Sequence, residues 1–160
     1  MGFNIAGIAI NKNYEGQLDV LKQKFNWKLK QEGTVSFETA SGNWKEDGIC
    51  DIYFLPNATL IFLPMEMCTD PYIIEGSNVL TFVISEMSMA FNIIYTENNK
   101  VVRNILEVEG NTLSNEGTPL AVEKEAEDTS EILWKQLEVV LGKTYWDIDL
   151  EEKVSRFTFV

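Results

Sequence analysis

The chain has no histidine among its 160 residues, although it has 25 acidic and 13 basic side chains. Histidine is the side chain whose unperturbed pKa lies closest to neutrality, so it is the usual proton carrier and a common metal ligand. Its absence excludes Ser-His-Asp and Cys-His nucleophile systems, imidazole metal sites and histidine-ligated haem. Carboxylate chemistry stays open, because glycoside hydrolysis needs only two acids.

Cysteine and proline are also scarce, with two and four residues. Cys50 and Cys68 lack the CxxC spacing of a zinc or redox pair. Two separated thiols are typical of a reducing compartment, where cysteines are buried and unpaired. Residues 1–16 have no basic region followed by an apolar core, so they do not resemble a signal peptide. We therefore expect a cytoplasmic protein.

The chain also lacks long apolar runs and recognised site motifs. No apolar run approaches the roughly 20 residues of a membrane span. There is no Gly-rich nucleotide loop, no GxSxG elbow and no zinc-ligand cluster. The run 147–152 has the alternating acids of a calcium loop, but Glu152 and Thr158 occupy the positions where an EF-hand needs glycine and glutamate. We therefore predict no catalytic residue, no metal site and no cofactor.

Acidic charge is abundant and unevenly placed. The net charge of −12 repels nucleic-acid phosphate and anionic lipid, so we expect neither as a partner, whereas a basic protein would be attracted. Residues 1–31 carry five basic and two acidic side chains, whereas residues 107–160 carry five basic and thirteen acidic ones. This asymmetry predicts an acidic surface that docks on a basic protein. The plainer interpretation is a solvated, self-repelling surface.

Apolar residues make up 45% of the chain, enough for the core of a single α+β domain over residues 1–160. Periodicity predicts two main helices: one spans 14–25 with Asn13 as its N-cap, and the other begins after Asp128 and ends before Gly142. Strands are predicted at 3–10, 27–30, 34–39, 51–55, 59–63, 78–85, 89–96, 101–108 and 154–160.

Short turns join several of these strands. Strands joined so closely are antiparallel, so the core is predicted to be an antiparallel β-meander sheet packed by the two helices. The segment 97–100 is a good hairpin turn, because asparagine tolerates positive φ. The segment 78–85 is apolar on both faces, as expected of a central strand covered on both sides. The polar stretch 109–128 is expected to hold only a short strand near 120–122.

Residues 17–36 resemble residues 136–155 at a constant offset, so that Gln17 matches Gln136 and Trp27 matches Trp146. If the similarity is a duplication, a helix–strand–strand unit occurs at either end of the meander and the fold has pseudo-symmetric halves. The alternative is that two amphipathic helices leading into strands share a pattern by chance, since true repeats usually recur three or more times.

The candidate binding residues are one tryptophan and four acids. Trp44 lies in the polar loop 41–47 and is predicted to be the most exposed of the four tryptophans, which makes it a candidate interface anchor. The acids precede the second predicted helix, and they are Glu123, Glu125, Glu127 and Asp128.

A family resemblance rests on the last third of the chain. The residues that carry it are Gly117-Thr118-Pro119-Leu120 with Glu123, the helix 132–141, Trp146 and Arg156-Phe157. This layout resembles that of small uncharacterised bacterial α+β proteins, some of which belong to toxin-immunity families. The resemblance implies a cytoplasmic, non-enzymatic binding protein and supplies no catalytic residue.

Two functions follow from these observations. The first is a non-catalytic acidic binding protein, an inhibitor or immunity-type partner of a basic protein. The alternative is a carboxylate-dependent hydrolase or small-ligand-binding protein with a pocket on the sheet. Candidate acids for the hydrolase are Asp51, Glu66, Asp70 and Glu86. A structural or homo-oligomeric module is the third interpretation.

Overall fold

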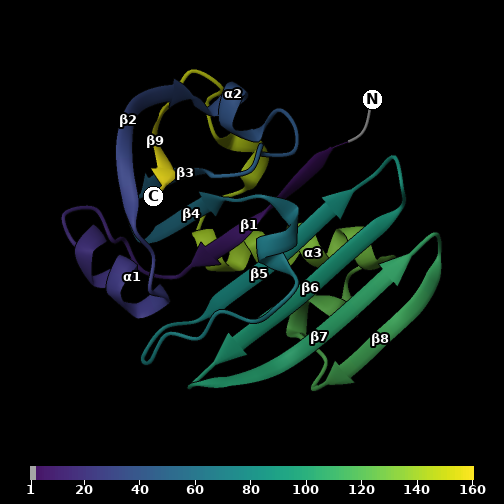
Figure 1. The fold of residues 1–160 in the computed structure, drawn as a ribbon. Helices are drawn as coiled ribbons and strands as arrows, with labels where there is room; N and C mark the ends of the chain where they lie inside the picture. The colour runs from purple at the N-terminus through teal and green to yellow at the C-terminus, as the bar shows by residue number, and fades with distance from the viewer. Residues whose placement is uncertain (1–2) are drawn as a thin grey trace.

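Nine strands form one antiparallel sheet in the computed structural model, which describes residues 3–160 (Figure 1). The strands are β1 Asn4–Ile10, β2 Leu29–Ser36, β3 Ile49–Leu55, β4 Ala58–Phe62, β5 Val79–Ser85, β6 Ala90–Glu97, β7 Lys100–Val108, β8 Asn111–Gly117 and β9 Lys153–Phe159. The helices are α1 Leu18–Phe25, α2 Phe37–Ser41 and α3 Thr129–Leu141, with 3₁₀ turns η1 Met65–Cys68, η2 Ala121–Lys124 and η3 Tyr145–Asp147. Helices and strands are thus combined in one fold, as the α+β prediction requires.

The strand order is β2-β9-β3-β4-β1-β5-β6-β7-β8. Strands β5 to β8 form a meander of consecutive hairpins, and β3 and β4 form another hairpin. The rest departs from the predicted meander, because β1 lies between β4 and β5, and β9 lies between β2 and β3. The first and last strands are therefore internal strands of the sheet.

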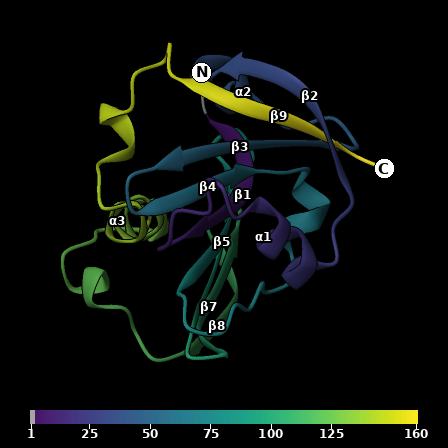
Figure 2. The same cartoon turned by 90° about the vertical axis from the view of Figure 1, so that its left-hand side faces the viewer.

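Alternating side chains form one hydrophobic core on each face of the sheet. On the face that we call the α3 face, Leu133 and Leu137 of α3 pack with Ile5 and Phe82. The opposite face packs Leu21 of α1 with residues of β1, β3, β4 and β5. Figure 2 shows α3 on one side of the twisted sheet and α1 on the other. Burial of these alternating side chains supplies the main driving force for folding.

Local signals locate several elements correctly. Asp128 caps α3, because its carboxylate accepts a hydrogen bond from the Glu131 N–H, and Gly142 ends the helix with a φ of 72°. Asn98 and Asn99 both have positive φ in the β6–β7 turn, as a tight hairpin requires. All seven residues of β5 are buried, which confirms it as a central strand.

Other segments differ from the expectation. Strand β8 forms within the polar stretch 109–128, and its exposure at the sheet edge explains why it lacks apolar alternation. The chain forms η2 where a short strand was expected. Strand β2 is continuous with a bulge near Gly33, and residues 37–41 form α2. Helix α1 begins at Leu18, while Asn13 accepts a hydrogen bond from the Glu15 N–H in the preceding turn.

The fold gives no support to the internal duplication. The two units would be α1–β2 and α3–β9, and β2 does pair with β9, with Val35 opposite Val154. However, α1 and α3 pack on opposite faces of the sheet. A twofold relation between neighbouring antiparallel strands would put both helices on one face. The pseudo-symmetric halves therefore stay a prediction, and α2 is a third helix in addition to the two that were expected.

Candidate functional site

The four predicted acids lie together between β8 and α3, but Glu123 is engaged within the fold. Arg103 of β7 donates hydrogen bonds from Nε and Nη2 to its carboxylate at 2.9 and 2.8 Å. Burial acts to raise the pKa of Glu123, but the hydrogen bonds from Arg103 and from the Leu120 N–H outweigh burial and lower it. Glu123 thus fastens η2 to the sheet.

Asp128 also has a structural role. Its carboxylate accepts hydrogen bonds from the Glu131 N–H at 2.9 Å and the Ser130 hydroxyl at 2.8 Å, and these bonds lower its pKa. Glu125 and Glu127 are exposed and form no salt bridge with another residue in the described range 3–160. Among the four acids, Glu125 and Glu127 are therefore the two that are free to meet a partner.

The prediction that Trp44 is the most exposed tryptophan is wrong. Trp44 is half-buried and packs against the core on the α1 side, whereas Trp146 of η3 is 54% exposed. The neighbouring Lys45 explains the difference, because its Nζ lies 2.8 Å from the carboxylate of the fully buried Asp51. Because this ion pair holds the loop against the sheet, the adjacent Trp44 is partly buried.

Trp146 lies on an aromatic platform. Its ring centroid is 4.9 Å from that of Phe3 and 4.6 Å from that of Trp134 on α3. Leu150, in the loop that follows, is 52% exposed. An exposed tryptophan fixed by ring contacts, with an exposed leucine in the same loop, has the character of an interface anchor.

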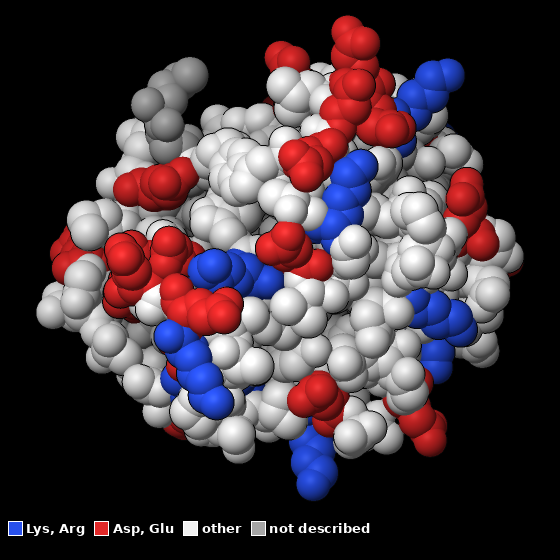
Figure 3. Space-filling model, turned by 180° about the vertical axis from the view of Figure 1, so that it is seen from behind, with Lys and Arg blue, Asp and Glu red and all other residues white. Residues whose placement is uncertain are grey.

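Acids lie on the two segments that form this anchor: Asp147 and Asp149 follow Trp146, and Glu138 lies one helical turn after Trp134. We call the group the Trp146 surface and define it by Trp146, Leu150, Glu138, Asp147 and Asp149. The three acids are exposed and form no salt bridge with any residue of the described range. Figure 3 shows the molecule from the side on which α3 lies, where acidic side chains gather toward the upper part and the left edge. The sequence signal that points to this surface is a tryptophan followed by the alternating acids 147–152.

Asp51, the first candidate acid for a hydrolase, is enclosed in an ion triad. Besides Lys45, Arg156 of β9 donates to its carboxylate from Nε at 2.9 Å and from Nη2 at 2.8 Å. Burial acts to raise the pKa of Asp51, but the hydrogen bonds from Arg156 and Lys45 outweigh it and lower the pKa. Asp51 is therefore an ionised structural group.

A hollow of about 200 Å³ near the start of α3 does bring three acids together. Each of them accepts a hydrogen bond from the protein: Glu86 from the Phe3 N–H, Glu107 from the Thr129 hydroxyl and Asp128 from the Glu131 N–H. A hydrolase needs a carboxyl group with a raised pKa, whereas that of Asp128 is lowered. Within residues 3–160, no three Asp, Glu or Cys side chains are placed to hold a metal ion.

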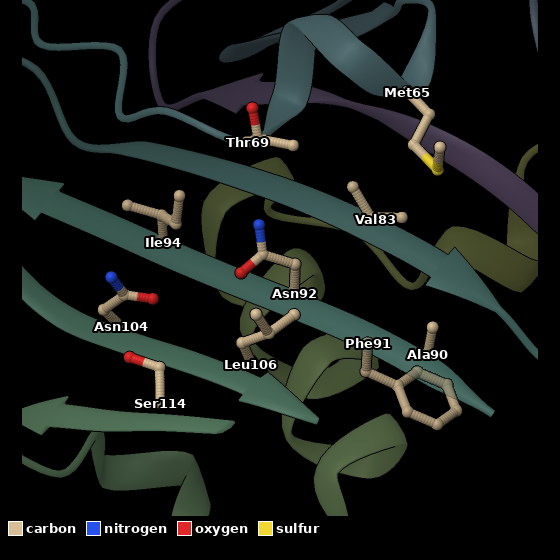
Figure 4. Close-up of a pocket in the computed structure, with 10 residues that line it drawn as sticks. All are labelled: Met65, Thr69, Val83, Ala90, Phe91, Asn92, Ile94, Asn104, Leu106 and Ser114. Carbon is tan, nitrogen blue, oxygen red and sulfur yellow. The ribbon is translucent and has the colours of Figure 1, made fainter. Parts of the chain in front are cut away.

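A larger hollow of about 340 Å³ lies on the face opposite α3, over β5 to β8 (Figure 4). Its apolar lining includes Met65, Val83, Ile94 and Leu106. Its polar lining consists of uncharged groups, namely Thr69, Asn92, Asn104 and Ser114. A pocket of the kind that the alternative function requires thus lies on the sheet, and none of its lining residues within 3–160 is acidic.

Comparison of the chain with protein-family models, with curated proteins and with solved structures gives no match. No helix of residues 3–160 has both the length and the apolar character needed to cross a lipid bilayer. The function is therefore inferred from the residues and contacts described above.

Proposed function

We propose that this chain is a non-catalytic binding protein, of the inhibitor or immunity type, whose Trp146 surface docks on a basic partner protein. The observation that carries the proposal is an exposed tryptophan packed on Phe3 and Trp134, beside exposed acids that form no salt bridge within residues 3–160. Glu138 and Asp149 each accept one local hydrogen bond, from the Thr144 hydroxyl and the Glu151 N–H, and keep their negative charge exposed. Tryptophan is enriched among the few residues that supply most of the binding energy at protein interfaces. A ring that is already ordered loses little conformational entropy when a partner covers it.

The acids of the surface act mainly on the rate and selectivity of association. A net charge of −12 creates a long-range field that attracts a basic protein, and charges at the rim of an interface chiefly change the association rate and its salt dependence. Two copies of this chain would bring like charges together at this surface. A basic partner fits the surface better than a homodimer does.

The carboxylates support binding better than hydrolysis. Hydrolysis by paired acids needs one protonated carboxyl group beside a second carboxylate. The pKa of Asp51 and that of Asp128 are lowered, and both groups are engaged in hydrogen bonds that stabilise the fold. The resemblance to immunity families fits an inhibitor. We propose a cytoplasmic location because Cys50 and Cys68 are both free thiols.

The test is affinity capture from the native host with three baits. The first bait is the wild-type protein, and the second is Trp146→Ser combined with Asp147→Asn and Asp149→Asn. The third is a charge-matched control, Asp70→Asn with Glu75→Gln, which removes two exposed acids that lie outside the Trp146 surface. Candidate partners are then purified and titrated against each bait by isothermal titration calorimetry at two salt concentrations.

We expect a basic protein that binds the wild type and the control with similar affinity, and the Trp146 variant at least tenfold more weakly. The affinity of the wild type should fall as the salt concentration rises. A partner that binds all three baits equally would contradict the proposed surface. Hydrolytic activity that is lost on changing Glu86 or Glu107 would favour the enzyme instead.

A further inference from the structure

The hollow over β5 to β8 lies on a part of the sheet that no α-helix of residues 3–160 covers. Helix α3 packs along the opposite face, and α1 lies over the other half of the sheet (Figures 1 and 2). One side of the hollow is the segment around η1. This segment is tied to β6 by two hydrogen bonds, from Asn92 Nδ2 to the Cys68 carbonyl and from the Thr96 hydroxyl to the Tyr72 carbonyl. The segment around η1 therefore forms one fixed side of the hollow, and the strands form its floor.

The lining chemistry of the hollow differs from that of the rest of the surface. Of the whole chain, 24% of residues are charged, yet none of the ten residues that line the hollow carries a charge. An open face of an antiparallel sheet is usually polar and solvated. Here Val83, Ile94 and Leu106 give the floor an apolar surface that water covers poorly.

Polar groups are placed within this apolar floor. Asn92 is only 8% exposed, and the one hydrogen bond that its side chain forms with another residue of the described range is donated from Nδ2. Figure 4 shows the Asn92 oxygen directed away from η1, toward the space between Ile94 and Asn104. A carbonyl oxygen held in this way is an acceptor for a ligand donor. Asn104 and Ser114 on the adjacent strands supply further uncharged donors and acceptors.

A second hollow of about 400 Å³ adjoins the first and shares Met65, Val83 and Ala90 with it. It extends the apolar floor to Trp44 and to Met87, which is 78% exposed. Methionine side chains adapt their shape to different apolar ligands. Ligand sites commonly have about 300–1,000 Å³, an apolar lining and a few convergent polar groups, and the first hollow has these properties.

We propose that this hollow, which we call the sheet hollow, binds a small uncharged molecule with a flat apolar body and one hydrogen-bond donor. The donor faces the Asn92 oxygen, and the apolar body lies on Val83, Ile94 and Leu106. Anionic molecules are excluded by the absence of a cationic lining group and by the net charge of −12. The site is independent of the Trp146 surface, so each proposal can fail without the other.

The test uses two fluorescent probes that differ in charge. N-phenyl-1-naphthylamine is neutral, has fused aromatic rings and carries one N–H donor, and its sulfonated analogue 1-anilinonaphthalene-8-sulfonate is anionic. We expect the neutral probe to bind one site at least tenfold more tightly than the sulfonate. Equal affinity for the two probes would overturn the proposal, and so would failure of the neutral probe to bind.

Three variants locate the site. Leu106→Trp fills the sheet hollow and should weaken binding of the neutral probe at least tenfold. Leu113→Trp adds the same ring at an exposed position of β8 outside the lining and should leave affinity unchanged. Asn92→Leu removes the acceptor and should weaken binding by about threefold to tenfold. If Leu106→Trp binds the probe as the wild type does, or if Leu113→Trp weakens binding equally, the assignment is wrong.

Discussion

The two faces of the sheet are made by the same strands but are covered differently. On the α3 face, Leu133 and Leu137 are fully buried, and the charged groups Asp51 and Arg103 are paired. On the opposite face, no α-helix in the described part of the chain covers β6 to β8, and the uncharged sheet hollow lies over β5 to β8. The comparison shows that, over β5 to β8, the buried contacts lie mainly on the α3 face and an open hollow lies on the other face. Changes of buried side chains on the α3 face should cost stability, and changes in the sheet hollow should cost ligand binding.

The sharpest test of this separation is Asp51→Asn. Asp51 lies in the sheet opposite Phe62 and Arg156, and its substitution leaves Lys45 and Arg156 without their carboxylate. Removal of one partner from a buried ion pair costs about 3–5 kcal/mol. Urea denaturation should show this loss in the free energy of unfolding. As a control, Asp19→Asn breaks an exposed pair with Lys22 and should leave the midpoint unchanged.

A matched pair of leucine truncations compares the two faces directly. Leu137→Ala removes a fully buried side chain from α3 and should reduce the free energy of unfolding by about 2–5 kcal/mol. Leu106→Ala removes a half-buried side chain from the sheet hollow and should cost less than about 1.5 kcal/mol. Chemical denaturation of both variants gives the difference. Equal losses would mean that the open face also supports the fold.

Acid pH should lower the free energy of unfolding by protonating the paired carboxylates on the α3 face. The pKa values of Asp51 and Glu123 are lowered in the folded state, so their stabilisation is complete above their unfolded pKa values near 4 and is lost as the pH falls further. Because both pKa values are lowered, these two carboxylates stay ionised between pH 6 and 8 and do not change the free energy of unfolding there. The chain also has no histidine that could titrate in this range. Denaturation measured from pH 8 to pH 3 should show a larger acid loss for the wild type than for Asp51→Asn. Parallel pH profiles would contradict this assignment.

The smallest expected effect distinguishes two neighbouring acids. Glu123→Gln leaves the buried Arg103 without its charged partner and should cost about 1–2 kcal/mol of folding free energy. Glu125→Gln changes an exposed carboxylate and should cost about 0.5 kcal/mol or less. Hydrogen exchange of residues 118–128 provides a second measurement, because only Glu123→Gln should accelerate it. Similar exchange in both variants would show that Glu123 does not fasten η2.

Local signals in the sequence account for the parts of the fold that were predicted. Helix α3 was located by its N-cap, its apolar stripe and Gly142, and the β6–β7 hairpin by two asparagines. Strand β8 was missed because an exposed edge strand needs no apolar alternation. The positions of β1 and β9 within the sheet depend on pairing between distant residues, which no local pattern reveals.

The candidate site was predicted only in part, for a similar reason. The acidic segment before α3 is present, but Glu123 pairs with Arg103 across twenty positions of sequence. Trp44 lies among polar residues, and its burial follows from the contact between Lys45 and Asp51. The exposure of Trp44 thus depended on an ion pair between its neighbour and a buried acid six positions further on, which no local pattern reveals. The uncharged lining of the sheet hollow likewise comes from several separate segments.

The place of β9 in the sheet has a consequence for synthesis on the ribosome. Strand β2 has β9 as its one neighbour, and Leu29 pairs with Phe159. The meander β5 to β8 can form as soon as its residues emerge, since its pairings are local. Strand β2, made early, stays without a hydrogen-bonding partner until residues 153–159 have been translated. During that interval β2 and β3 each have an edge that β9 later covers, and open strand edges favour pairing with other chains.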